Sequence, residues 1–384
     1  MFSGRSCSVH AAFPRVLRFA VAQLVLALLL GATNVRAWEL PPGATGWQEA
    51  GVGAIRGITV GPIESSQWPG RGYGSAYSEQ LLDELVRLGA TWISVTPFGR
   101  LWSLTSSEIV RDFEAPYPDN QRAVARMIEQ AHARGLKVLV IPHLWVETGG
   151  WRGEIDPGSE AGWARYHASY RAFVLGWAKL AARAGADAFS VGVECKSWSG
   201  RFLSVWRKLI RSVRAVFPGL LTYSANWDEA AHVLFWDQLD LIGINAFYPL
   251  ASHAGASYRE YVEGAQRARA EVAALVHTHD KPALFVEVGY TTRKDAAVEP
   301  WLWPDDMTEV AYDEAEQARA LSAVIEVFAP EPWFSGLFIW RYYASLDDVS
   351  QEDAWGFSPH AKAAERLIRA SFHLEWASDS SLKY

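Results

Sequence analysis

Two glutamates end short apolar runs and are the first candidates for chemistry. Glu194 closes the run Phe189-Ser-Val-Gly-Val-Glu194, and Glu287 closes the run Ala283-Leu-Phe-Val-Glu287. Runs of this length and composition are typical of buried parallel strands. In a barrel of alternating strands and helices, residues at the strand ends face the active-site mouth. Two such carboxyl groups can cleave a glycosidic bond, one as proton donor and the other as nucleophile or base.

Eight apolar, strand-like runs that alternate with amphipathic stretches must position this pair. The strand-like runs are 56–62, 92–97, 137–142, 188–194, 220–225, 240–246, 283–288 and 336–340. The helical stretches are 76–88, 120–134, 161–184, 201–217, a short one at 229–236, 258–278, 313–328 and 359–371. Gly89, Gly135 and Gly185 follow three of these helices, where a left-handed cap is favoured.

Eight strand–helix units with no linker between them predict an α/β fold, a (β/α)8 TIM barrel in a single domain. By this count, Glu194 ends the fourth strand and Glu287 ends the seventh. An open doubly wound sheet is the structural alternative. It would place a glycine-rich phosphate turn after the first strand, and Gly57-Ile-Thr-Val-Gly61 does not match that motif.

Composition narrows the function classes. The chain has 384 residues, a formal charge of -7, and no stretch in which Lys and Arg alternate with aromatic residues, so nucleic acid is an unexpected partner. The sequence contains 19 Trp. Indole rings stack well on the apolar faces of sugar rings, although about half of these residues are expected to fill the core instead. We therefore expect a carbohydrate partner, and a monomer.

The first 37 residues have the features of a secretory signal peptide. Arginines precede the apolar segment 19–31, and Val35-Arg-Ala37 offers small residues for cleavage. Removing this segment would take away four Arg and no acid, changing the net charge from -7 to -11. The apolar segment is short for a membrane span, so an uncleaved anchor is the less favoured alternative. We expect a secreted or periplasmic protein, cleaved near Ala37, with no stable membrane insertion afterwards.

The predicted domain therefore spans residues 38–372, and a polar tail occupies 373–384. After cleavage Cys195 is the one remaining cysteine, so no intramolecular disulfide is expected. No metal or cofactor is expected either. The chain lacks an H-E-x-x-H motif and a cysteine pair, the acidic stretch 347–353 lacks the spacing of a calcium loop, and neither a G-x-S-x-G elbow nor a P-loop is present.

A series of motifs along the chain matches a known family. The motifs are Gly192-Val-Glu194, Leu221-Thr-Tyr-Ser-Ala-Asn226-Trp227-Asp228, Trp236-Asp-Gln-Leu-Asp240-Leu-Ile-Gly-Ile-Asn245-Ala-Phe-Tyr248-Pro, Phe285-Val-Glu287-Val-Gly289-Tyr290, Phe338-Ile-Trp340 and Gly356-Phe-Ser-Pro359. In this order, from residue 56 to about 371, they resemble glycoside hydrolase family 113, retaining β-mannanases of a clan of (β/α)8 barrels. The resemblance implies that Glu194 is the general acid/base and Glu287 the nucleophile.

These roles make opposite demands on the two carboxyl groups. Glu194 must carry a proton near neutrality, which the apolar neighbours Val191 and Val193 favour, whereas Glu287 must stay ionised. Tyr248 and Asn226, at the ends of strands six and five, are the expected hydrogen-bond donors to Glu287. Val193 is a departure, because much of the clan has Asn there to bind the sugar 2-hydroxyl; Asn226 is our candidate replacement.

Further aromatic and polar residues are predicted to bind substrate. The resemblance implies that Trp340 floors the sugar subsite next to the cleaved bond, although a core aromatic is the alternative. His143, directly after strand three, is expected to bind a sugar hydroxyl unless it is structural. Trp145 and Trp151, in a glycine-rich loop, and Trp227, in a matching motif, are expected to supply aromatic platforms.

Several alternatives remain open from the sequence. Either glutamate could form a structural ion pair, with Lys196 as the obvious partner of Glu194. Glu147 and Asp228 are rival acids near other strand ends. We favour a retaining hydrolase of β-linked, mannan-like poly- or oligosaccharides that acts within the chain. The alternatives are a glycan-binding barrel without turnover and a transglycosylase using the same two acids.

Overall fold

The computed structural model describes residues 54–62, 69–303, 310–347 and 355–373 of the chain. The predicted signal segment 1–37 lies outside these ranges, and so does the predicted tail except for its first residue. The predicted domain boundaries therefore stay predictions.

Eight parallel strands close into a barrel, which confirms the predicted fold class. The barrel strands are β1 (Ile55–Gly61), β2 (Trp92–Val95), β4 (Lys137–Val140), β6 (Ala188–Val193), β7 (Leu220–Asn226), β8 (Ile242–Asn245), β9 (Ala283–Val288) and β10 (Phe334–Tyr343). Their order around the barrel is β1-β10-β9-β8-β7-β6-β4-β2, so each strand pairs with its sequence neighbours among the eight. Because β6 is the fourth barrel strand and β9 the seventh, the predicted strand count was correct.

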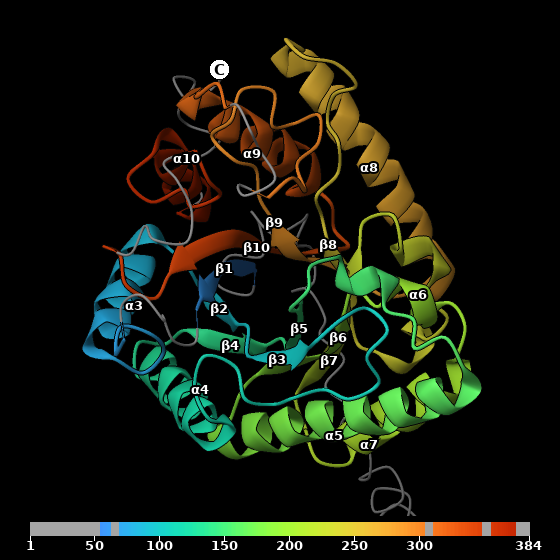
Figure 1. The fold of residues 1–384 in the computed structure, drawn as a ribbon. Coiled ribbons are helices and arrows are strands. Elements are labelled where there is room, and N and C mark those ends of the chain that lie inside the picture. Colours follow the sequence, from blue (N-terminus) through green and yellow to red (C-terminus); the bar gives the residue numbers. More distant parts are fainter. Residues whose placement is uncertain (1–53, 63–68, 304–309, 348–354, 374–384) are drawn as a thin grey trace, which may run out of the picture. The chain divides into compact units, whose positions relative to one another are not determined.

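Helices surround the strands (Figure 1). They are α3 (Ala76–Leu88), α4 (Tyr117–His132), α5 (Glu160–Ala184), α6 (Lys196–Ser199), α7 (Leu203–Arg214), α8 (Tyr258–His279), α9 (Glu314–Phe328) and α10 (Ala363–Phe372). The glycines after α3 and α5 adopt the predicted left-handed caps, with φ of 92° at Gly89 and 80° at Gly185. In these two helices, the last carbonyls accept hydrogen bonds from the cap amides, which ends each helix sharply.

The helix predicted at 229–236 is wrong. This segment forms two 3-10 turns, Ala230–His232 and Trp236–Gln238. Phe235 and Trp236 are adjacent in sequence and both buried. Trp236 Nε1 donates to the Ala230 carbonyl at 3.0 Å, so the segment folds back on itself and does not continue as one helix.

A second sheet, which the sequence did not predict, extends from the carboxyl ends of two barrel strands. β3 (Phe98–Leu101) follows β2, β5 (His143–Val146) follows β4, and the two pair in parallel. Since side chains alternate along a strand, His143 and Trp145 lie on one face of β5. This small sheet gives the predicted binding residues after strand three a regular backbone.

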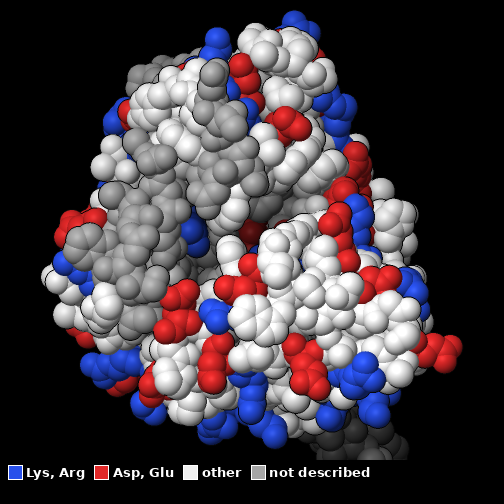
Figure 2. Space-filling model, viewed as in Figure 1, with Lys and Arg blue, Asp and Glu red and all other residues white. Residues whose placement is uncertain are grey.

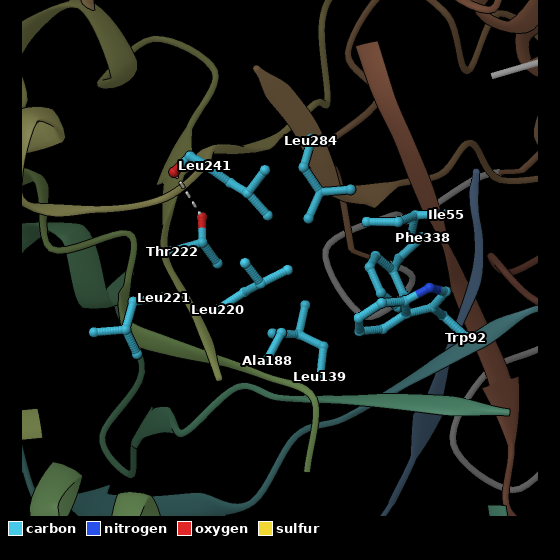
Figure 3. Close-up of a pocket in the computed structure, with 10 residues that line it drawn as sticks. All are labelled: Ile55, Trp92, Leu139, Ala188, Leu220, Leu221, Thr222, Leu241, Leu284 and Phe338. Atoms are coloured by element: carbon cyan, nitrogen blue, oxygen red, sulfur yellow. Dashed lines mark hydrogen bonds between the residues drawn. The ribbon is translucent and has the colours of Figure 1, made fainter. Parts of the chain in front are cut away.

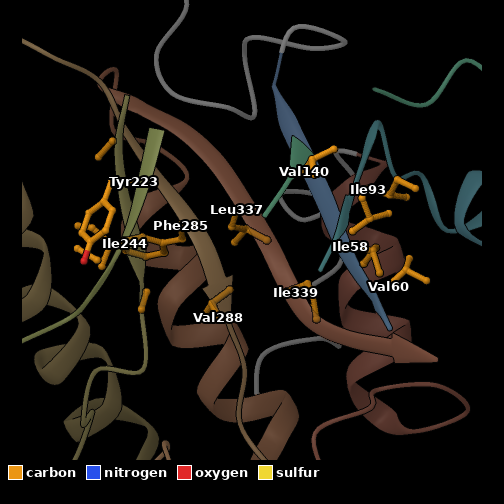
Figure 4. Close-up of a cluster of buried hydrophobic side chains, with 14 of the residues drawn as sticks. Ile58, Val60, Ile93, Val140, Tyr223, Ile244, Phe285, Val288, Leu337 and Ile339 are labelled. Carbon is orange, nitrogen blue, oxygen red and sulfur yellow. The ribbon is translucent and has the colours of Figure 1, made fainter. Parts of the chain in front are cut away.

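The core has two layers. Outward-facing strand residues such as Ile58, Ile244 and Phe285 belong to the large cluster that also contains the buried helix residues (Figure 4). Inward-facing residues such as Leu139 and Phe338 fill the barrel interior. Gly57 is required in this layer, because a Cβ atom there would lie 2.3 Å from the Phe338 ring.

The amino-terminal end of the barrel is closed by apolar side chains (Figure 3). They surround a small pocket lined by Ile55, Trp92, Leu139, Ala188, Leu220, Leu221, Thr222, Leu241, Leu284 and Phe338. The Thr222 hydroxyl donates to the Leu241 carbonyl at 3.1 Å. No charged side chain lines this pocket, which lies at the opposite end from Glu194 and Glu287, so we interpret it as the floor of the barrel.

Candidate active site

Glu194 directly follows β6 and has a left-handed backbone, with φ of 50°. In the ladder between β6 and β7, Ser190 pairs with Thr222 and Val193 pairs with Ser224, so β6 carries one extra residue between these pairs. Such a bulge redirects the side chains that follow it. Val193 packs inside the barrel, and Glu194, a residue that is 8% exposed, lies at the barrel mouth.

Three side chains donate hydrogen bonds to the Glu194 carboxyl group. Asn245 Nδ2 donates to Oε1 at 2.9 Å. Trp151 Nε1 and Arg152 Nη1 both donate to Oε2, at 2.8 and 3.2 Å. Each of these donors favours a negative charge on the oxygen that it contacts.

The glycine-rich loop after β5 brings two of these donors to the site. Gly149 and Gly150 have positive φ, at 84° and 98°. A Cβ atom at Gly153 would lie 2.5 Å from the Trp151 ring. The glycines therefore allow a tight turn in which the indole folds back over its own loop and reaches Glu194.

Glu287 lies near the end of β9 and is 4% exposed. The ladder between β8 and β9 is also irregular, because Ile244 pairs with Phe285 while Asn245 pairs with Glu287. Asn245 is thus the neighbour of Glu287 in the sheet while it donates to Glu194. One buried amide adjoins both carboxyl groups.

Several polar atoms around Glu287 have no hydrogen-bond partner among the described residues. They are both ring nitrogens of His143, Asn245 Oδ1 and Glu287 Oε1. His143 Nε2 lies 3.4 Å from Glu287 Oε1 without forming a hydrogen bond. A buried polar atom without a partner costs roughly 1–3 kcal/mol, which the hydroxyl groups of a bound ligand would recover.

Burial raises the pKa of Glu287 well above its ordinary value, and the neighbouring charge of Glu194 raises it further. Arg152, Arg341 and Asn245 act in the opposite direction. Burial also lowers the pKa of His143 well below its usual value, with Arg152 and Arg341 contributing. The imidazole is therefore neutral near pH 7, so it adds no positive charge beside Glu287.

Aromatic rings surround the two glutamates. Trp340, in β10, is 7% exposed, and its ring stacks on His143 with centroids 6.2 Å apart. A chain of ring contacts then leads outward from His143 through Phe98 and Phe113 to Trp145, which is 42% exposed. Figure 2 shows a hollow at the centre of this face, with acidic atoms deep inside it and basic atoms on its wall.

Comparison with known proteins decides the family of this chain. The model of Glycoside Hydrolase Family 113 matches residues 68–362, more than three quarters of the sequence. The chain belongs to glycoside hydrolase family 113. It is therefore a glycoside hydrolase, of the endo-mannanase-like kind.

Solved structures agree with this assignment. The GH113 β-mannanase AaManA from Alicyclobacillus acidocaldarius is 28% identical, with a TM-score of 0.72, over 83% of this chain and 97% of that one. A GH113 β-1,4-mannanase is 26% identical, with a TM-score of 0.71, over 83% and 98%. A β-glucuronidase from Faecalibacterium prausnitzii, 14% identical with a TM-score of 0.57, shares the fold over 83% of this chain and 48% of that one. A search of curated proteins gave no match.

In this member of family 113, the two donors expected at Glu287 lie elsewhere. Asn226 Nδ2 donates to Asp228 Oδ1 at 2.8 Å. Tyr248 is buried against Trp227 and Phe285. Within the described residues, neither Asn226 nor Tyr248 makes a hydrogen bond to Glu287, so that expectation was wrong. The reason is local: Asn226 is bound within its own turn, and the tyrosine ring packs between aromatic neighbours.

Glu194 does form an ion pair, with Arg152 at 3.2 Å and not with the expected Lys196. Lys196 pairs with Asp228 at 2.5 Å. Glu147 pairs with Arg100 at 3.1 Å and is partly exposed. Both rival acids are therefore engaged in ion pairs at the surface, whereas Glu194 and Glu287 are buried at the mouth.

Four residues of the site were not predicted from the sequence. They are Asn245 and Arg152 beside Glu194, Arg341 beside Glu287, and Trp301, whose ring stacks on Trp227 at 5.7 Å. Trp151 was predicted as an aromatic platform, and its indole nitrogen donates to Glu194. Of the four, Asn245 carried a signal, as the residue before the last in the sixth apolar run, 240–246. The others lie in loops or in the extension of a strand, where the spacing of residues in the sequence does not indicate the direction of their side chains. Among the described residues, no group of three or more His, Cys, Asp or Glu side chains could hold a metal ion.

A Glu287→Gln substitution should stabilise the protein, and more at pH 8 than at pH 5. Because the folded-state pKa of Glu287 lies above its unfolded value, its contribution to stability is present below the unfolded pKa and is lost as the pH rises through the folded pKa. Glutamine carries no charge at either pH and avoids this loss. We therefore expect the free energy of unfolding to rise by about 0.5–2 kcal/mol at pH 8, the usual size for a stabilising substitution.

Urea unfolding of both proteins at the two pH values measures this difference. Glu147→Gln is the matched control, and removal of its surface ion pair should change the free energy of unfolding by less than about 1 kcal/mol. A Glu287→Gln protein less stable than wild type at pH 8 would contradict the electrostatic account.

Proposed function

We propose that this glycoside hydrolase cleaves β-linked, mannan-like poly- or oligosaccharides with retention of configuration. In this proposal Glu194 is the general acid/base and Glu287 is the nucleophile. The observation that carries it is the buried amide of Asn245, which donates to Glu194 and lies beside Glu287 in the sheet. Two buried carboxyl groups that share one neighbour at a barrel mouth match the needs of double displacement.

The reaction has two steps. Glu287 attacks the anomeric carbon while Glu194 gives its proton to the departing glycosidic oxygen, which leaves a covalent glycosyl-enzyme. Water then attacks the same carbon, and Glu194 accepts the proton that this water loses. Glu287 departs and regains its negative charge.

The electrostatics suit a pair that holds one proton between its members. Repulsion between two buried carboxylates disfavours the doubly ionised state. In the free protein, burial of Glu287 and the three donors at Glu194 favour the proton on Glu287, whereas the reaction requires the proton on Glu194 and the charge on Glu287. Arg152, Arg341 and Asn245 each favour the charged form of Glu287.

The polar atoms without protein partners are our candidates for recognising sugar hydroxyls. Val193 packs in the barrel interior and cannot bind a 2-hydroxyl, and the side chain of Asn226 is held by Asp228. Asn245 Oδ1 and the His143 ring nitrogens are buried beside Glu287 and lack partners among the described residues. We therefore transfer the proposed 2-hydroxyl role from Asn226 to Asn245.

Exposed tryptophans on two separate segments of the chain support cleavage within a polysaccharide. Trp145 is 42% exposed on β5, and Trp301 is 45% exposed in the loop after β9. These rings provide stacking surfaces beyond the buried Trp340, as a cleft that binds several sugar units requires.

We expect Glu194→Gln and Glu287→Gln each to lower kcat for mannan hydrolysis by at least about 100-fold, since each removes a group that transfers a proton or forms a bond. Both proteins should still fold and bind mannooligosaccharides. Glu147→Gln and Asp228→Asn are the controls and should keep activity within about threefold. Assays on mannan, glucomannan, β-glucan and xylan, with anomer-resolved NMR of the first products, provide the measurements.

The outcomes separate the alternatives. Unchanged activity in the Glu287→Gln protein would refute the mechanism, and initial release of the inverted anomer would refute retention. Binding of mannan by the wild-type protein without product release would favour a glycan-binding barrel. Longer products at high acceptor concentration would indicate transglycosylation.

Trp301→Ala should raise KM for mannohexaose about 2- to 10-fold, because one stacking surface is worth about 0.5–1.5 kcal/mol. The kinetics of an aryl β-mannobioside, which is too short to reach a distant ring, provide the internal control. Trp301→Phe keeps an aromatic face and should behave nearly as wild type. An equal rise in KM for both substrates would argue against a distant subsite.

We also propose that the protein is exported and cleaved near Ala37, supported by the arginines and apolar segment of the first 37 residues. In the part of the chain that the structure describes, no helix is both long and apolar enough to cross a membrane. Intact-mass measurement of the protein from the cell exterior or periplasm should give a chain that begins near Trp38. A chain that retains residues 1–37 would contradict cleavage.

A further inference from the structure

Glu229 is a buried carboxyl group behind the active site that the proposed mechanism does not use. It lies in the turn after β7 and is fully buried. Its Oε1 accepts a hydrogen bond from the Tyr223 hydroxyl, and its Oε2 accepts one from the Asn226 backbone amide at 3.1 Å. Within the described residues, no Lys, Arg or His forms an ion pair with it.

The Tyr223 hydroxyl connects Glu229 to the residue after Glu194. It accepts a hydrogen bond from the Cys195 backbone amide at 2.6 Å. A hydroxyl group has one proton, and Tyr223 donates it to Glu229, which leaves its lone pairs free to face Cys195. The carboxylate thereby fixes the direction of the hydroxyl.

This connection matters because the Glu194 backbone is in an unfavourable conformation. A left-handed φ costs a residue other than glycine roughly 1–2 kcal/mol, and it persists only where its surroundings enforce it. Both amides that flank the Glu194 Cα atom are held by β7. Glu194 N donates to the Ser224 carbonyl at 2.8 Å, and Cys195 N donates to Tyr223.

Packing alone does not explain a carboxyl group at this position. Tyr223 and the rings of Trp206 and Phe235 form a tightly packed aromatic layer outside the barrel. Burial in this layer raises the pKa of Glu229 to about 7. A buried acid without a cation usually destabilises a fold relative to an apolar side chain. Its two hydrogen bonds go to Tyr223 and Asn226 of β7, and the Tyr223 hydroxyl continues the connection to Cys195 after β6 (Figure 4 shows Tyr223).

We propose that Glu229, acting through Tyr223, is a positioning residue that holds the backbone of Glu194 so that its carboxyl group meets the glycosidic oxygen. The inference rests on the acid/base role proposed above for Glu194. Loss of the connection would let the Cys195 amide turn away from β7. The Glu194 carboxyl group would then no longer be held where the leaving oxygen lies.

Two aryl β-mannobiosides provide the test, because they differ in their need for a proton donor. A dinitrophenolate leaves without protonation, whereas a phenolate leaves slowly unless Glu194 protonates it. For Tyr223→Phe, kcat/KM should fall about 10- to 100-fold on the phenyl substrate and less than about threefold on the dinitrophenyl substrate. Glu229→Gln should give the same pattern with a smaller loss.

The matched control is Tyr170→Phe. The Tyr170 hydroxyl is buried in the same aromatic layer and donates to the Val191 carbonyl at 3.2 Å. It lies 3.7 Å from Cys195 Sγ, but it does not accept the hydrogen bond of the Cys195 amide, which goes to Tyr223. We expect this variant to change kcat/KM by less than about twofold, and by the same factor on both substrates. Circular dichroism and thermal unfolding report whether each variant folds, and Glu229→Gln carries the test if Tyr223→Phe does not.

Glu194→Gln, assayed on the same two substrates, separates the inference from the proposed function. Glu194→Gln should lose more kcat/KM on the phenyl substrate than on the dinitrophenyl substrate. If it does, equal losses of kcat/KM on both substrates for Tyr223→Phe and Glu229→Gln would overturn the positioning role. If Glu194→Gln itself shows no such dependence, the acid/base assignment fails, and the positioning role falls with it.

Discussion

Repulsion between two carboxyl groups that share one buried barrel mouth governs the structure around them. Water screens like charges poorly at such a depth, so the surroundings must compensate. Asn245 lies between Glu194 and Glu287, while Arg152 and Arg341 bring positive charge to the pair. The Arg341 guanidinium also packs over the rings of Trp303 and Trp340. The aromatic walls therefore position a charge as well as offering surfaces to a sugar.

The backbone contributes as much as the side chains. Extra residues in the ladders of β6 and β9 alter the regular alternation just where Glu194 and Glu287 occur. A regular strand would turn one of two consecutive side chains outward, yet Val193 and Glu194 both face the barrel interior and its mouth. The outer aromatic layer supports this irregular backbone, so the packing outside the barrel bears on the geometry inside it.

Much of the fold followed from the sequence because parallel barrel strands are buried on both faces. Such strands appear as short apolar runs, and the runs ending at Glu194 and Glu287 were counted correctly as the fourth and seventh. The short sheet of β3 and β5 lacked this signal, since Phe98–Leu101 and His143–Val146 include exposed and charged positions. The helix expected at 229–236 is replaced by two 3-10 turns, which the Trp236 indole connects by donating to the Ala230 carbonyl.

The site was less predictable than the strands for a physical reason. Strand counting gives the height of a residue in the barrel but not the direction of its side chain, which bulges and loop turns decide. Asn226 and Tyr248 are therefore at the expected level yet face other partners. Trp151 and Arg152 reach Glu194 only because Gly149, Gly150 and Gly153 permit a tight turn. Bulges and loop turns of this kind leave no periodic pattern in the sequence, so the contacts that they create could not be predicted from it.

The pairing of β5 with β3 restricts how this site can diverge during evolution. His143 faces the buried pair, while Trp145, two residues further on, is exposed. Inserting or deleting one residue within β5 would turn these two side chains to opposite faces of the sheet. A change in length near Gly149 and Gly150 would leave this spacing intact but would move Trp151 and Arg152 relative to Glu194. The spacing of His143 and Trp145 and the length of the following turn are therefore constrained for different reasons.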